Sequence, residues 1–122
     1  MNAFDHERLV VYQRALDFVV EIDEMRRKLP SGRHALRNQL DRAALSIPLN
    51  IAEGAGEYAV GEKVRFYRIA RRSATECAAI LDVIERLKLG PEPSIGSARN
   101  RLRSIVSMLV SLAKRKEHPS PP

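Results

Sequence analysis

The chain has 122 residues, a length that suits a single domain. Its 44% hydrophobic and 30% charged residues are typical of a folded protein, and 21 Lys and Arg against 15 Asp and Glu give a formal net charge of +6. One cysteine excludes an internal disulfide and a four-cysteine zinc site, and no apolar run is long enough to span a bilayer. Residues 1–8 lack the apolar core of a signal peptide, so we expect a soluble cytoplasmic protein without a membrane partner.

Glycine and proline clusters at residues 29–32, 54–61 and 90–94 divide the chain into four segments with apolar residues at spacings of three and four. The first predicted helix covers about residues 7–28 and carries acids at its start and bases at its end, as the helix dipole favours. The second begins near Arg33 and contains Pro48, where either a helix kinks or two helices meet. Because the apolar spacing continues through Pro48 in phase, we expect a kink.

The third predicted helix is the most clearly amphipathic, and its apolar stripe is formed by Phe66, Ile69, Ser73, Cys77, Ile80, Ile84 and Leu87. Gly90 is expected to terminate it, and Ser94 is a candidate N-cap for a fourth helix with the same pattern. Four helices with short loops predict an all-α fold, an antiparallel up-down four-helix bundle over residues 1–117. Residues 118–122, which include three prolines, are predicted to form a disordered tail.

A second apolar face is predicted on the second helix, where Leu45, Leu49 and Ala52 lie roughly opposite the core-facing isoleucines. Isolated leucines are common on protein surfaces and need no explanation. The grouping of these residues around the expected kink favours instead a face that is buried against another subunit. We therefore expect a homo-oligomer with closed cyclic symmetry.

Side chains that carry catalysis are sparse in this sequence. His6, His34 and His118 are dispersed and form neither a Glu-x-x-His nor a His-x-x-x-His metal pattern. Cys77 lies in an apolar stripe, which predicts a buried core thiol rather than a nucleophile. The segment around Gly61 differs from a phosphate-binding P-loop, because a glutamate precedes the lysine and no strand precedes the loop. We expect no enzyme, no metal, no cofactor and no small-molecule substrate.

Five polar residues fall on inward-facing edges of the second and third helices, namely Ser46, Asn50, Glu53, Ser73 and Glu76. Buried polar groups need hydrogen-bond partners, so we expect these side chains to meet one another or an arginine where the two helices pack. Such a network would fix the helix register, and Asn50 could cap backbone groups released by Pro48. The less favoured alternative is a ligand-binding or catalytic carboxylate pair, since no base, metal ligand or nucleophile accompanies the carboxylates.

The excess positive charge lies in the second half of the chain. Arginines at spacings of three and four project from the third helix away from its apolar stripe, and further bases follow on the fourth. The candidate nucleic-acid-binding residues are Lys63, Arg65, Arg68, Arg71, Arg72, Arg99, Arg103, Lys114, Arg115 and Lys116. Such a ridge can follow a phosphate backbone, although a solvated face or intersubunit ion pairs would leave the same pattern. Only Tyr67 interleaves with these bases, so we expect backbone contacts with little sequence specificity.

Two motifs resemble those of a known family. Residues 46–54 read Ser-Ile-Pro-Leu-Asn-Ile-Ala-Glu-Gly, and residues 65–76 read Arg-Phe-Tyr-Arg-Ile-Ala-Arg-Arg-Ser-Ala-Thr-Glu. From about Phe4 to Ala113 the chain is similar to the small bacterial four-helix-bundle proteins encoded in intervening sequences of 23S ribosomal RNA genes. Tyr12 stands where that family often has tryptophan, and Arg72 stands where a small residue is expected.

The resemblance implies an antiparallel four-helix bundle that assembles as a ring-like homopentamer and has no known catalytic activity. In fold and charge, though not in motif, the chain is also similar to basic pentameric accessory proteins of diversity-generating retroelements, which associate with a reverse transcriptase and nucleic acid. The sequence therefore favours a non-enzymatic homo-oligomer that acts as a scaffold or RNA-associated accessory protein. The alternative is a protein-interaction module whose arginines pair with an acidic partner.

Overall fold

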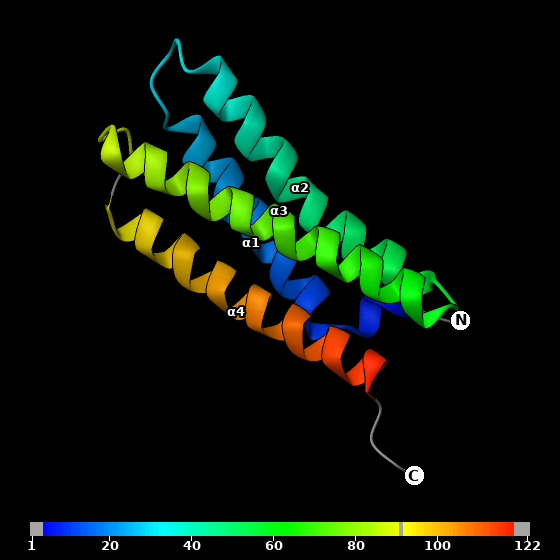
Figure 1. Ribbon diagram of the computed structural model, residues 1–122. Helices are drawn as coiled ribbons and strands as arrows, with labels where there is room; N and C mark the ends of the chain where they lie inside the picture. Colours follow the sequence, from blue (N-terminus) through cyan, green and yellow to red (C-terminus); the bar gives the residue numbers. More distant parts are fainter. Residues whose placement is uncertain (1–3, 91, 119–122) are drawn as a thin grey trace.

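Four long α-helices dominate the computed structural model, which describes residues 4–90 and 92–118 (Figure 1). A short 3-10 helix, η1 (Asp5–Arg8), precedes α1 (Val10–Arg27), α2 (His34–Gly56), α3 (Val60–Arg86) and α4 (Glu92–Glu117). The described residues contain no strand, so the prediction of an all-α chain with four helices is confirmed. Of the expected tail, His118 is exposed, and residues 119–122 lie outside the described residues.

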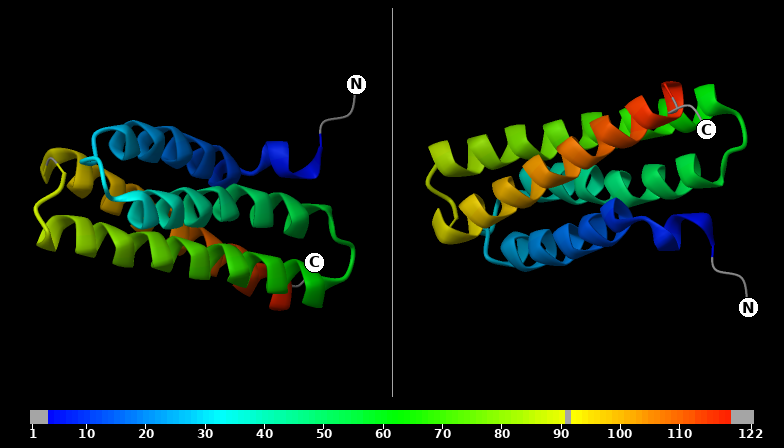
Figure 2. Two further views of the ribbon diagram at one scale, coloured as in Figure 1. Left: turned by 90° about the horizontal axis from the view of Figure 1, so that it is seen from above. Right: turned by 90° about the horizontal axis from the view of Figure 1, so that it is seen from below.

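The helices lie side by side along the length of the molecule. Consecutive helices pack against each other, and α1 also packs against α4. The α1–α2 and α3–α4 connections lie at one end, whereas η1, the α2–α3 connection and the last turn of α4 lie together at the other, which we call the η1 end (Figures 1 and 2). Within the two described ranges, none of the helices has the length and apolar character that crossing a membrane requires.

A single α-helix, α2, continues through Pro48, so the alternative of two helices meeting at this residue is not observed. Proline has no N–H group, and the carbonyl of Ala44 one turn earlier therefore loses its usual helical donor. The expectation that Asn50 caps this gap is wrong. Its side-chain amide donates to the carbonyl of Ser46, one turn earlier, at 2.8 Å. The carbonyl of Ala44 lies six residues before Asn50, beyond the reach of this side chain.

The core is one cluster of hydrophobic side chains from all four α-helices. Among the residues whose side chains are described, no polar or charged side chain is buried. Cys77 is 0% exposed within this cluster, and burial raises the pKa of its thiol to about 12. The thiol therefore stays protonated near neutral pH and serves as a packing group rather than a nucleophile.

The buried face of α3 differs from the predicted one at both ends of the helix. Phe66 and Ile69 were expected in the core but are only half-buried, and Leu87 is 46% exposed. Tyr67 and Ala70, each one position further along the chain, are buried in place of the first two. Only the middle of the predicted stripe is correct.

Gly54 of α2 explains why Tyr67 takes the core position. A Cβ atom built on Gly54 would lie 2.8 Å from Cε1 of Tyr67 and 3.0 Å from Cβ of Phe66. The Tyr67 ring therefore occupies the space that a side chain at position 54 of α2 would fill. The close approach of the two helices at this glycine turns Tyr67 inward and leaves Phe66 at the edge of the contact.

A Schellman motif ends α3 at a residue that the sequence does not single out. Lys88 adopts a left-handed backbone with φ 58°, and its N–H donates to the carbonyl of Glu85 at 3.0 Å. The N–H of Leu89 donates to the carbonyl of Ile84 at 3.0 Å. Gly90 was expected to terminate α3 as the glycine that follows the C-cap, and this expectation is wrong. The C-cap of α3 is Leu87, so Lys88 takes the left-handed position where glycine is usual.

Gly54→Ala should lower the free energy of unfolding by about 1–3 kcal/mol, because the new methyl group would overlap the Tyr67 ring and force the helices apart. Urea unfolding followed by circular dichroism measures this loss. Gly56→Ala is the matched control, since a Cβ atom at that position meets no atom within 4 Å. Equal stability of the two variants would contradict the role of Gly54.

Lys88→Gly should raise the free energy of unfolding by about 1 kcal/mol, because glycine adopts a positive φ without the clash that a Cβ atom causes. Thermal unfolding monitored by calorimetry measures the gain. Lys28→Gly changes the C-cap of α1, where φ is −89°, and should bring no gain. If Lys88→Gly destabilises the protein, the lysine side chain contributes more than the strained backbone costs.

Candidate nucleic-acid interface

Two arginines of the α3 ridge are exposed but already hold carboxylates. Arg65 donates from Nε at 3.2 Å and from Nη2 at 3.1 Å to Oε2 of Glu62, and its guanidinium lies 4.6 Å above the Phe66 ring. Arg68 pairs with Glu117 of α4, with 3.2 Å between Nη2 and Oε2. Exposed ion pairs contribute about 0–1 kcal/mol, so both guanidinium groups could exchange these carboxylates for phosphate oxygens at small cost.

The remaining arginines of the ridge, Arg71 and Arg72, are exposed and have no carboxylate partner within the described residues. A groove of about 130 Å³ between α3 and α4 is lined by Arg68 and Arg71 on one side and by Lys114 on the other. The last turn of α4 lies beside the first half of α3 (Figure 2). The structure thus joins two basic segments into one surface, the α3/α4 basic face, which consists of Arg65, Arg68, Arg71, Arg72 and Lys114. Arg115 is exposed but does not line the groove.

Lys63 is turned away from this face. Its half-buried ammonium donates to the carbonyl of Gly54 at 3.1 Å and to that of Ala55 at 2.8 Å, and so caps the C-terminus of α2. Burial lowers the pKa of Lys63, and the charge of Lys116 lowers it further. A cation at this place satisfies carbonyl groups that have no partner within their own helix.

Arg99 and Arg103 lie along α4 toward the α3–α4 connection. The Arg99 side chain is only 21% exposed, and its guanidinium donates to Asp82 at 2.7 Å and to Glu85 at 3.1 Å. The hydrogen bonds that Arg99 donates to Glu85 and then to Asp82 raise the pKa of Arg99 above its usual value. Arg103 is exposed and donates to the side chain of Asn100 at 2.8 Å. Arg99 therefore joins α4 to α3 through ion pairs, which we call a clamp, and it lies apart from the basic face.

Glu117 was missed by the sequence reasoning, although it is the carboxylate that lies among the cations of the basic face. Its one signal in the sequence is its position directly after the three bases of the last turn of α4. A similar clamp between α4 and α1 was also missed, in which Arg101 contacts Glu21 at 3.2 Å and Asp17 at 3.8 Å. These pairs join residues far apart in the chain, and helical spacing carries no information about them.

The predicted polar network is smaller than expected and lies at the surface edge of the α2–α3 contact. Ser73 donates to Oγ of Ser46 at 2.8 Å, and Asn50 donates to the same Oγ at 2.9 Å. Glu53 and Glu76 are exposed and take no part in these hydrogen bonds among the described residues. In the described part of the chain, no cluster of three His, Cys, Asp or Glu side chains is placed to hold a metal ion.

An apolar surface flanks this polar cluster. Leu45 is 49% exposed and Leu49 is 62% exposed, while Ala52 is half-buried. On α3, Phe66 and Ile69 are half-buried, and Cβ of Phe66 lies beside Gly54 of α2. The α2/α3 apolar face consists of Leu45, Leu49, Ala52, Phe66 and Ile69.

Comparison with known proteins identifies relatives of this fold. Residues 7–111 match the family model of the 23S rRNA-intervening sequence protein. The structure is similar to the crystal structure of a protein with unknown function from the S23 ribosomal protein family of Bacteroides thetaiotaomicron, with a TM-score of 0.80 and 24% sequence identity over 86% of this chain and 99% of that chain. At that identity the likeness bears on the fold alone. No curated protein matches the sequence.

Proposed function

The chain belongs to the 23S rRNA-intervening sequence protein family, and from this premise we propose that it is a non-enzymatic, homo-oligomeric scaffold or accessory protein that binds RNA in the cytoplasm. The observation that carries the proposal is the α3/α4 basic face. Exposed cations from two helices meet at one groove there, and Arg71 and Arg72 have no carboxylate partner among the described residues.

The scaffold we propose is an antiparallel up-down four-helix bundle in which α2 bends at Pro48. Short connections at alternate ends of the molecule support the antiparallel arrangement. The missing N–H of Pro48 supports the bend, because it leaves the Ala44 carbonyl without its helical donor. A rigid rod of this kind would hold the arginines of α3 at fixed spacing.

RNA would be bound through its phosphate backbone. Guanidinium groups pair with phosphate oxygens in a bidentate manner, and each contact releases counterions. Tyr67 is 2% exposed and Phe66 lies beneath Arg65, so neither ring offers an open stacking surface on the basic face. The face would therefore follow the path of a strand or the shape of a helix, with little preference for sequence.

We further propose that the α2/α3 apolar face is buried against another copy of the chain, and that the assembly is a ring-like homopentamer. Leu45 and Leu49 expose about half or more of their surface to water in the single chain. A contiguous apolar patch rimmed by polar groups marks an interaction surface more often than chance. Oligomerisation would also repeat the basic face around the ring, which would multiply weak phosphate contacts.

A second candidate function is binding to an acidic protein segment. The pairs of Arg65 with Glu62 and of Arg68 with Glu117 favour it, because these arginines already bind carboxylates in the single chain. Phosphate is the better partner for the face as a whole, since its charges repeat at a spacing that the arginine ridge can follow.

Replacing Arg68, Arg71 and Arg72 together by glutamine should weaken binding of structured RNA and reduce the slope of log affinity against log salt by about 2–3, one counterion term for each lost contact. Fluorescence anisotropy at several salt concentrations measures both quantities. The matched control replaces Arg14, Arg42 and Arg86, which are exposed elsewhere, with the same loss of charge. Equal weakening by both triple variants would contradict a defined face, and binding of labelled poly-glutamate without binding of RNA would favour the acidic partner.

Leu49→Glu should dissociate the assembly, because a carboxylate would be buried in the subunit contact without a partner. Light scattering during size-exclusion chromatography measures the mass, and circular dichroism verifies that the helices persist. Val20→Glu on α1 is the matched control, since Val20 is 60% exposed and lies outside the α2/α3 apolar face. A wild-type protein that is monomeric at micromolar concentration would overturn the proposed assembly.

A further inference from the structure

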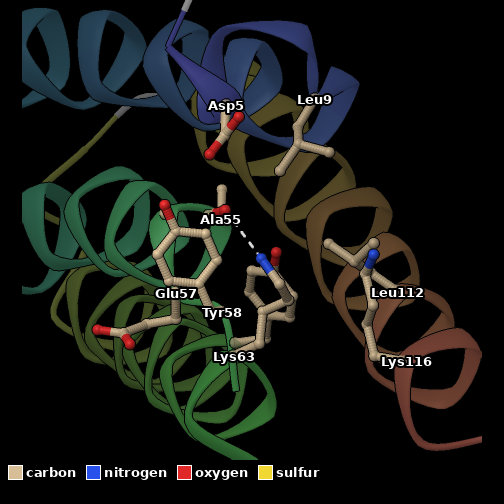
Figure 3. Close-up of a pocket in the computed structure, with 10 residues that line it drawn as sticks. Asp5, Leu9, Ala55, Glu57, Tyr58, Lys63, Leu112 and Lys116 are labelled. Atoms are coloured by element: carbon tan, nitrogen blue, oxygen red, sulfur yellow. Dashed lines mark hydrogen bonds between the residues drawn. The ribbon is translucent and has the colours of Figure 1, made fainter. Parts of the chain in front are cut away.

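A second cavity opens at the η1 end of the molecule, separate in composition from the basic face. It has a volume of about 400 Å³, which falls within the range of small-molecule sites, about 300–1,000 Å³. The residues that matter for its chemistry are Asp5, Glu57, Tyr58, Lys63, Tyr67 and Lys116 (Figure 3). They come from η1, the α2–α3 connection, α3 and the last turn of α4, so only the folded chain brings them together.

Two cations share this cavity. Lys63 uses two of its three N–H donors on the carbonyls of Gly54 and Ala55, which leaves one donor for a ligand. Lys116 stands exposed on the α4 side of the cavity. The two ammonium groups are close enough that the charge of Lys116 lowers the pKa of Lys63. An anion placed between them would relieve this repulsion.

Asp5 and Glu57 also line the cavity, and the Asp5 carboxylate points into it, whereas the Glu57 carboxylate points away from the two ammonium groups (Figure 3). Asp5 and Glu57 both act electrostatically on Lys63, and Asp5 also acts on Tyr67. A bare inorganic anion would meet the Asp5 carboxylate as well as the two cations and would gain less than the cations alone suggest. A ligand that carries both an anionic group and hydrogen-bond donors satisfies Lys63, Lys116 and Asp5, and carboxylates accept readily from the amino groups of bases.

Tyr58 adds a flat apolar surface. Its side chain is 100% exposed in the α2–α3 connection, at the wall of the cavity. A fully exposed aromatic ring beside a phosphate-binding cation is the arrangement on which an unpaired base stacks. The basic face lacks such a ring, so the cavity supplies what that face does not.

We propose that this cavity binds one unpaired nucleotide, with its phosphate between Lys63 and Lys116, its base on Tyr58, and its donor groups toward Asp5. The nucleotide belongs to the RNA strand held by the basic face, so this inference rests on the proposed function. Tyr67 connects the two surfaces, because it lines both the cavity and the α3/α4 groove. Lys114 of the groove and Lys116 of the cavity are two residues apart in the last turn of α4, so a strand that passes around the end of this helix can reach both.

The test compares two RNA hairpins, one blunt and one with a short unpaired adenosine tail, by fluorescence anisotropy. The wild-type protein should bind the tailed hairpin about tenfold more tightly, and Tyr58→Ala should remove this advantage while leaving the blunt hairpin unchanged. Tyr58→Phe should keep it, and Val60→Ala is the control for a neighbouring exposed side chain. Equal binding of both hairpins by the wild type would overturn the inference and leave RNA binding by the basic face intact.

The charge of the cavity is tested with Lys116→Gln, which should weaken the tailed hairpin more than the blunt one. Lys28→Gln removes an exposed charge outside the η1 end and should affect neither selectively. If Lys116→Gln weakens both hairpins equally, Lys116 belongs to the basic face and the cavity has no nucleotide role.

A third measurement separates the cavity from the proposed function. Adenosine 5′-monophosphate is titrated while the pKa of Lys63 is followed by NMR of its side-chain Cε. A phosphate beside the ammonium favours the charged form, so the pKa of Lys63 should rise on binding. If neither hairpin binds but this rise occurs, the proposed RNA function fails and the nucleotide site stands, with a free nucleotide as its ligand. If no rise occurs and the tail brings no advantage, the site is refuted.

Discussion

The packing of Tyr67 against Gly54 sets the rotation of α3 about its own axis, and the surfaces of the molecule depend on that rotation. Tyr67 is 2% exposed and fills space that a side chain on α2 would otherwise take. Because successive residues of a helix are about 100° apart, an inward Tyr67 directs Arg65 and Arg72 outward and brings Arg71 to the α4 side. The same rotation leaves Phe66 at the edge of α2. Core packing, the basic face and the apolar face are therefore consequences of one helix contact.

The cations of this basic chain divide into two groups by what they touch. Arg99 and Arg101 hold α4 to its two neighbours through carboxylates, and Lys63 caps α2. These groups already contribute to the fold, and moving them to an outside ligand would leave carboxylates or carbonyls without their partners. Among the described residues, no carboxylate partner holds Arg71, Arg72 or Lys114 in place. The surface on which RNA would compete least with the fold is therefore the α3/α4 basic face.

Sequence periodicity was sufficient to predict where the helices lie in the chain, but not how each helix is rotated about its own axis. Glycine and proline punctuation predicted four helices with ends close to those observed, and the apolar character of Leu45 and Leu49 as an exposed pair was also predictable. The buried face of α3 was not, because Phe66 and Tyr67 are both apolar and adjacent, and their burial depends on how α3 packs against Gly54 of a different helix. Likewise, Lys63 looks like part of the ridge until the end of α2 is placed beside it.

The two ends of the molecule differ in how their charges are used. Near the α1–α2 and α3–α4 connections, Arg26 contacts Asp41 at 2.9 Å and Arg99 contacts Asp82 at 2.7 Å, so cations there join neighbouring helices. At the η1 end, Lys63 caps the C-terminus of α2 with two of its N–H donors, Lys116 is exposed, and both side chains line one cavity. A polyanion gains most binding free energy where cations repel each other and have few fixed partners, since its phosphates then relieve that repulsion. At the η1 end Lys116 meets this condition, and Tyr67 lies between its cavity and the groove along which a strand would arrive.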